Sequence, residues 1–201
     1  MSGAFPTTVA LADMTITSLE PTQVSVTHSL KRQVRRRGGQ RWGLRGSYAP
    51  LTRAQAAELF AFSVKQRGQF ETFTIVPPTV STPMGVATGT PLINGAHVAG
   101  DTTIATDGWT NSTADILKAG DYIKFAGHDK VYMVTADAIS SSSGGAVTVS
   151  IHPALMSALA NNEGITVSNV PFTVAFASDQ QDVSEAASGT FGFSISLVEV
   201  A

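Results

Sequence analysis

The sequence contains no cysteine, which excludes a disulfide framework and a cysteine-ligated zinc site. No apolar run approaches the roughly eighteen residues of a membrane-spanning helix, so we expect no membrane span. The first residues lack a basic stretch followed by a long apolar one, and we expect no signal peptide. Only 14% of the residues are charged. This low charge, with abundant Ser, Thr, Ala and Gly, favours a protein that covers much of its surface with partners.

Catalytic and cofactor-binding motifs are also missing. The sequence has no G-x-S-x-G, no P-loop and no G-x-G-x-x-G, so we expect no catalytic residue and no cofactor. The four histidines lie at positions 28, 97, 128 and 152, without i, i+4 pairing, and we expect no metal site. Two aspartate pairs, Asp101 with Asp107 and Asp115 with Asp121, have acid–base spacing. Their closeness to glycine instead favours turn formation.

Positive charge is concentrated in one short segment. Residues 30–46, LKRQVRRRGGQRWGLRG, hold seven of the thirteen Lys and Arg residues, although the formal net charge of the chain is −2. Such a cluster is typical either of a nucleic-acid-binding arm or of one face of a folded ribbon. The low net charge does not favour a protein that binds duplex DNA over its whole surface.

Alternation of side chains favours the folded ribbon. Residues 22–34 alternate around Val24, Val26 and Val34, and residues 42–48 alternate around Trp42 and Leu44. Gly38-Gly39 between the two runs predicts a tight hairpin turn, because glycine accepts positive φ angles. In this hairpin we expect the Trp42 side chain to be buried in the core. The outer face carries five cations that we expect to form a protein–protein interface: Lys31, Arg35, Arg37, Arg41 and Arg45.

Elsewhere the patterns predict a mainly β protein with one helix. Thr52 and Gln55 form a capping box before a helix over 53–66, with Gly68 as its C-cap and an apolar stripe that includes Val64. Strands are expected near 70–76, 171–178 and 190–199. Between Pro78 and Pro171 the composition shifts to short runs rich in Gly, Ser and Thr. We interpret 80–170 as an inserted small β-barrel-like domain, and 1–79 with 171–201 as the domain that receives it.

Two short helical pieces are expected inside the insert. STADILKAG, residues 112–120, resembles a helical turn before a strand at 122–125, and PALMSALAN, residues 153–161, is compatible with a short helix. GHDK at 127–130 is expected to form a turn between two strands. Trp109 and Tyr122 are the aromatic residues that could stack on a sugar, although Trp109 after Asp107-Gly108 is also typical of a turn-anchored core residue.

Two blocks of the sequence resemble a known family. The first runs from Gln40 to Phe73 and contains QRW, YAPLTRAQAAELFAF and RGQFETF; the second contains GDTTIATDGW, LKAGDYIKFAGHDKVYMVTAD and VTVSIHPAL. Together they cover about two thirds of the chain and are similar to distal tail, or baseplate hub, proteins of long-tailed bacteriophages. The resemblance implies a tail-tube-like β-sandwich or split barrel with one helix, assembled as a hexameric ring, and an outer β-domain.

The resemblance also implies a function and a location in the virion. A ring of this kind would join the tail tube to tip, hub and fibre proteins and leave a channel through which DNA passes. It implies no active site. Two alternatives stay open at this point: a nucleic-acid-binding module that uses the basic hairpin 31–45, and a carbohydrate-binding module on the insert.

Overall fold

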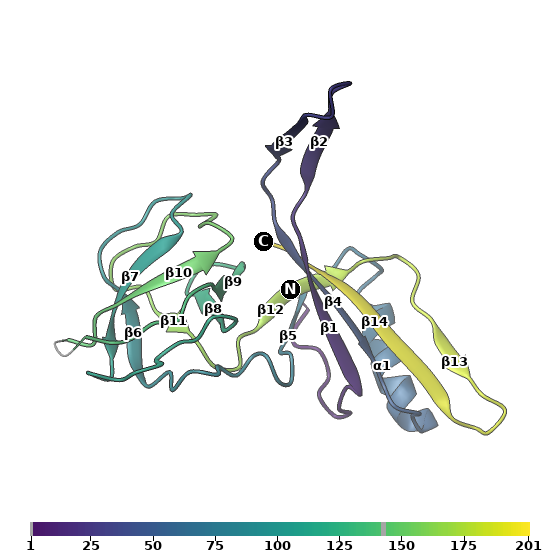
Figure 1. The fold of residues 1–201 in the computed structure, drawn as a ribbon. Coiled ribbons are helices and arrows are strands. Elements are labelled where there is room, and N and C mark those ends of the chain that lie inside the picture. The colour runs from purple at the N-terminus through teal and green to yellow at the C-terminus, as the bar shows by residue number, and fades with distance from the viewer. Residues whose placement is uncertain (1, 142–143) are drawn as a thin grey trace. The chain divides into compact units, whose positions relative to one another are not determined.

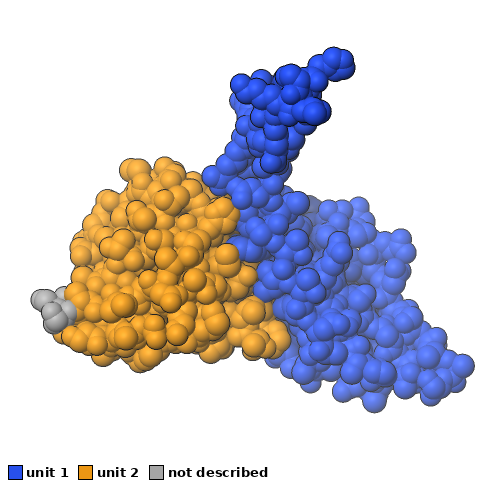
Figure 2. All heavy atoms as spheres, viewed as in Figure 1, with its two compact units in different colours: residues 1–73, 174–200 blue, residues 74–173, 201 orange. Residues whose placement is uncertain are grey.

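The computed structural model describes residues 2–141 and 144–201, and the chain divides into two compact units (Figures 1 and 2). Unit 1 consists of residues 1–73 and 174–200, and unit 2 consists of residues 74–173 with Ala201. Each unit has its own β-sheet framework and its own buried residues. The mainly β fold class with one helix is therefore confirmed.

The first sheet is the sandwich-like framework of unit 1. Its strands follow the order β1-β4-β14-β12-β5, and β13 also pairs with β14 (Figure 1). The strands of this sheet are β1 (Asp13–Leu19), β4 (Arg41–Ser47), β5 (Phe73–Ile75), β12 (Phe172–Phe176), β13 (Val183–Glu185) and β14 (Phe191–Glu199). Strand β4 is antiparallel to β1 on one side and to β14 on the other.

Strand β4 carries the alternation that the sequence predicts. Trp42 is 3% exposed and Leu44 is fully buried, whereas Arg41 and Arg45 are exposed. The register places Leu44 opposite Ile16 of β1 and Leu197 of β14, so one face of three strands is apolar. The Trp42 backbone N–H also donates to the buried Glu199 carboxylate over 3.2 Å. The predicted core role of Trp42 is confirmed.

The single helix of the described residues, α1 (Arg53–Lys65), begins with the predicted capping box. The Thr52 hydroxyl accepts from the Gln55 N–H, and the Gln55 side chain accepts from the Thr52 N–H. Ala56, Leu59 and Ser63 are buried, and Phe62 packs edge-on against Phe73 with ring centroids 5.3 Å apart. The helix therefore covers the apolar face of the sheet.

Two details at the end of α1 differ from the prediction. Val64 is 57% exposed, so it lies outside the buried stripe. The C-cap is Gln66, and the chain leaves the helix through Arg67 and Gly68, which both have positive φ. Arg67 is therefore the first residue after the cap with a left-handed backbone, and Gly68 is the second.

The hairpin turn is not at Gly38-Gly39, and this prediction was wrong. Strand β2 (Thr22–Val26) pairs with β3 (Arg32–Arg36), and the turn between them spans residues 27–31 with Leu30 at φ 60°. The Thr27 hydroxyl accepts from the Lys31 N–H and stabilises this turn. Gly38 and Gly39, at φ 72° and 75°, lie instead where the chain passes from β3 to β4.

Unit 2 is a nearly closed six-stranded barrel. Its strands follow the order β11-β8-β9-β10-β7-β6, and an isolated bridge between Leu92 and Gly164 joins the two ends. The strands are β6 (Gly89–Ile93), β7 (Thr103–Trp109), β8 (Tyr122–Phe125), β9 (Val131–Val134), β10 (Val147–His152) and β11 (Ile165–Thr166). The barrel encloses an apolar core that includes Ile104, Phe125 and Val149.

Neither short helix expected in this unit forms. At 112–120, Ser112 and Asp115 adopt positive φ, and Leu117 makes a β-bridge with Ala138. At 153–161 the backbone bonds to another loop: the Leu155 N–H donates to the carbonyl of Asp101, and Leu159 bridges His97. Tertiary partners thus replace the hydrogen bonds of a helix. The predicted turn at 127–130 does lie between β8 and β9.

Trp42→Ala should lower the free energy of unfolding by about 3–5 kcal/mol, because it removes a large buried side chain and leaves a cavity. Val34→Ala is the matched control, since Val34 is 51% exposed and its truncation should change stability by less than about 0.5 kcal/mol. Urea unfolding followed by circular dichroism measures both. A Trp42→Ala variant as stable as the parent chain would contradict the core role.

Candidate assembly surfaces

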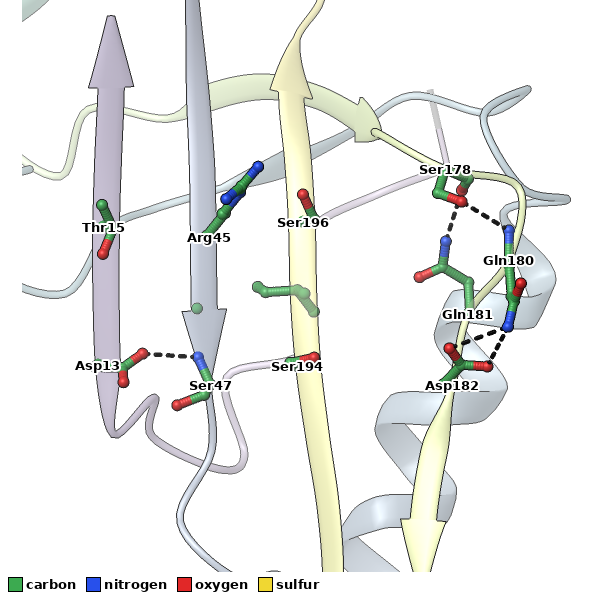
Figure 3. A pocket seen from close by; sticks show the side chains of 12 residues that line it. Asp13, Thr15, Arg45, Ser47, Ser178, Gln180, Gln181, Asp182, Ser194 and Ser196 are labelled. Carbon is green, nitrogen blue, oxygen red and sulfur yellow. Dashed lines mark hydrogen bonds between the residues drawn. The ribbon is translucent and has the colours of Figure 1, made fainter.

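The face of the first sheet opposite the core is polar. Its cross-strand rows include Thr15, Arg45 and Ser196, which follow one another across β1, β4 and β14. Figure 3 shows Arg45 between Thr15 and Ser196. All three residues are exposed. Hydroxyl groups with one guanidinium make this a face that favours water or polar partners over an apolar cover.

A groove borders this face along residues 178–182. Its lining includes Asp13, Arg45 and Asp182 (Figure 3). The loop is held by its own side chains, because the Gln180 amide donates to the Asp182 carboxylate over 3.0 Å and the Gln181 amide donates to the Ser178 carbonyl over 2.8 Å. The groove therefore presents both a cation and carboxylates, as an ionic protein contact requires.

The ribbon β2–β3, called the arm below, has no buried residue. One face carries Val24, Val26 and Val34, which are 48%, 58% and 51% exposed. Arg32 and Arg36 share this face, because they have the same strand parity as Val34. Exposed valines in a row indicate a surface for a partner, since an isolated two-stranded ribbon gains little stability in water.

The five cations predicted as an interface belong to two places in unit 1. Arg35 lies on β3, on the face of the arm opposite Val34. Lys31 ends the turn between β2 and β3, and Arg37 follows the end of β3. Arg41 and Arg45 lie on β4, in a different sheet. All five are exposed. They do not form one continuous ladder, because residues 37–40 separate β3 from β4.

Two strands with an unpaired edge were not expected from the sequence. Among the described residues, β1 pairs only with β4 and β13 pairs only with β14, so each leaves one edge without a strand partner. Alternation of Met14 and Ile16 with threonines was the available signal for β1. Strand β13 is three exposed residues and gives no periodic signal. An open edge is a template for pairing with another chain.

The candidate acidic pairs of unit 2 have structural roles. Asp121 is 2% exposed, and its carboxylate accepts the backbone N–H groups of Met84 at 2.7 Å, Gly85 at 3.2 Å and Lys118 at 2.8 Å. Asp115 makes an exposed ion pair with Lys118. The turn-forming interpretation is confirmed for both residues.

Asp101 and Asp107 do not form an acid–base pair either. Asp101 accepts from the Val98 N–H and contacts Nδ1 of His97 at 3.2 Å. The Ala105 N–H donates to Nε2 of the same imidazole, so Nδ1 carries the proton that is donated to Asp101. Asp107 lies inside β7 beside Gly108, which has a positive φ. The His97–Asp101 pair therefore closes a loop.

The two aromatic residues considered for sugar stacking do not form an open platform. Trp109 is 4% exposed, and its indole N–H donates to the Thr106 hydroxyl over 2.8 Å. Tyr122 packs edge-on against Phe172, and burial raises the pKa of its hydroxyl group. A sugar ring needs an exposed aromatic face, and the indole of Trp109 is enclosed by protein. The core interpretation of Trp109 is confirmed.

Over residues 2–141 and 144–201, no group of three or more His, Asp or Glu side chains is arranged to hold a metal ion. No helix in this part of the chain combines the length and the apolar character needed to cross a membrane. What the described surface offers is strand edges, an apolar arm and a polar sheet face. These features define a β protein with surfaces suited to assembly.

Comparison with known proteins agrees with this class. Residues 80–170 match the family model described as distal tail protein pb9, B domain. This match indicates a phage distal tail protein, so the resemblance found from the sequence is confirmed. The family is structural rather than catalytic and implies a location in the virion tail. No curated protein matched the chain.

Asp121→Ala should destabilise unit 2 by about 3 kcal/mol, because it leaves buried backbone N–H groups without an acceptor. Asp115→Ala is the control, since its carboxylate is exposed and its removal should have little effect. Thermal unfolding measures both variants. Equal stability of the two would show that the Asp121 carboxylate does not hold this turn.

Proposed function

We propose that the chain forms a ring, most simply a hexamer, at the distal end of a phage tail. The ring joins the tail tube to the tip or hub and the fibres, and it leaves a channel for DNA. The observation that carries this proposal is the open edge of β1. Asp13–Leu19 is a seven-residue strand with no proline and no lysine, the residues that commonly protect an edge.

Ring closure supplies a partner for such an edge. In a heterologous contact, one surface of each subunit binds a different surface of the next subunit. If the rotation between neighbouring subunits closes after a whole number of copies, the result is a ring in which each such edge is covered. In this proposal unit 1 builds the ring. Residues 80–170 form a peripheral domain, inserted between the two sequence segments, 1–79 and 171–201, of the ring-building domain.

The basic residues belong, in this proposal, to contacts between subunits. Arginine suits such contacts because its planar guanidinium makes paired hydrogen bonds to carboxylates. A nucleic-acid arm is the competing function. The valine face of the arm supports the protein contact, because DNA phosphates give exposed valines nothing to pack against.

Replacing Arg35, Arg41 and Arg45 with Ser should impair assembly and leave the monomer folded, because all three side chains are exposed. A variant with Arg53, Lys65 and Lys118 replaced by Gln removes the same charge elsewhere and should assemble normally. Sedimentation velocity measures assembly, and filter binding at physiological salt measures DNA binding. Tight duplex binding by the parent chain, with unchanged assembly of the Ser variant, would support the nucleic-acid function instead.

Removing residues 79–169 and joining Pro78 to Val170 through a short Gly-Ser linker should leave unit 1 folded and able to assemble. The compact division of the chain motivates this deletion. Far-UV circular dichroism and a cooperative melt test folding, and sedimentation tests assembly. A product without cooperative unfolding would mean that the insert is needed for the core of unit 1.

A further inference from the structure

We propose that strand β3 of one subunit adds to the open edge of β13 in a second copy of this chain, antiparallel and in one defined register. The inference rests on the proposed ring, and it names one pair of strands that meet there, apart from the edge of β1. Both strands have an edge without a strand partner among the described residues, because β3 pairs only with β2 and β13 only with β14. Their side chains complement each other position by position.

The complementary register places Val34 opposite Val183. The neighbouring pairs are then Arg35 with Asp182, Arg32 with Glu185, and Gln33 with Ser184, read from the antiparallel direction of the strands. Opposite charges and apolar side chains directly across an antiparallel pair stabilise it. Every position from 32 to 35 thus finds a matching partner in 182–185.

The faces of the two strands agree with this register. Val34 and Arg32 share one face of β3, and Val183 and Glu185 share one face of β13 because residues two apart point the same way. Val183 stands opposite the buried Phe193, so the Val34–Val183 contact extends the apolar side of the sheet. Arg35 and Asp182 then meet on the polar face.

Other pairings fit less well. Shifting the register by one residue places Val34 opposite Asp182 or Ser184 and turns each valine to the wrong face. A parallel arrangement keeps two charge pairs but sets Val34 against Ser184. Strand β2 carries no charge and so offers Asp182 and Glu185 no partner. The basic composition of β3 therefore selects it over β2.

The four partners are accessible on the single chain. Arg32, Arg35, Asp182 and Glu185 are exposed, and none of them has an ion pair among the described residues. Gly192 opposite Ser184 lets β13 lie close to β14, because a Cβ there would stand 2.6 Å from the Ser184 hydroxyl oxygen. Strand β13 is thereby held in place with its outer edge free for the second copy.

Disulfide trapping tests the register directly, because the chain has no cysteine of its own. Val34→Cys chains mixed with Val183→Cys chains should give covalent dimers on a non-reducing gel after mild oxidation. Facing residues of antiparallel strands have Cα atoms about 4.5–5.5 Å apart, within the range that a disulfide spans. The matched control pairs Val34→Cys with Ser184→Cys and should give no dimers; dimers there instead would indicate the parallel arrangement and overturn the proposal.

Charge reversal tests the same contact without a covalent bond. Arg35→Asp should raise the protein concentration needed for half-assembly by about tenfold, since the defect recurs at every interface of the ring. Asp182→Arg should act similarly, and the double variant should restore assembly. The β3–β13 pairing is overturned if rings form but the Val34→Cys and Val183→Cys chains give no covalent dimer and Arg35→Asp does not weaken assembly. The ring proposal would then still stand. A parent chain that stays monomeric at every concentration would overturn both.

Discussion

Strand β4 is hydrogen-bonded on both sides, to β1 and to β14, and its alternation decides which face of the first sheet is buried. A slip of one residue would turn Trp42 and Leu44 to solvent and drive Arg41 and Arg45 into the core. The cost of burying two guanidinium groups without partners makes such a slip unfavourable. The polar face and the position of Arg45 beside the groove follow from this fixed register, whereas the open edge of β1 follows from the strand order of the sheet.

The arm continues the antiparallel pair formed by β1 and β4. Beyond Leu19 and Arg41 the ladder is interrupted by Pro21 on one side and by Gly38-Gly39 on the other, and pairing resumes as β2 and β3. Within the part of the chain that the structure describes, no helix or second sheet covers the valines of this ribbon, which are 48–58% exposed. A monomer therefore carries an apolar, basic ribbon whose natural cover is another protein surface, which is consistent with a structural tail protein.

Period-2 alternation predicted the buried face of β4, the strands around Phe73 and Phe176, and the last strand with Phe193 and Leu197. A strong local signal also located α1, because the capping box is a short-range interaction. The hairpin turn was misplaced because Gly38-Gly39 is the stronger turn signal, whereas Leu30 in a left-handed conformation has no signature in the sequence. The expected helix at 153–161 failed because its backbone bonds to a distant loop.

The candidate interface was predictable only in part. Charge clustering identified the cations, but which strands carry them depended on the turn position. Strand β13 could not be found from three exposed residues, and the pairing with β3 that we propose could be formulated only once the strand pairing was known. For Asp121 the sequence left open an acid–base role, because of its spacing to Asp115. The three backbone N–H groups that donate to its carboxylate show a structural role instead.

The central claim is that this chain builds a closed ring, and negative-stain electron microscopy of the purified protein at high concentration tests it most directly. The account predicts rings of a single size with an open centre, which disassemble when the protein is diluted. A field of monomers at every concentration, or open filaments of varied length, would contradict it.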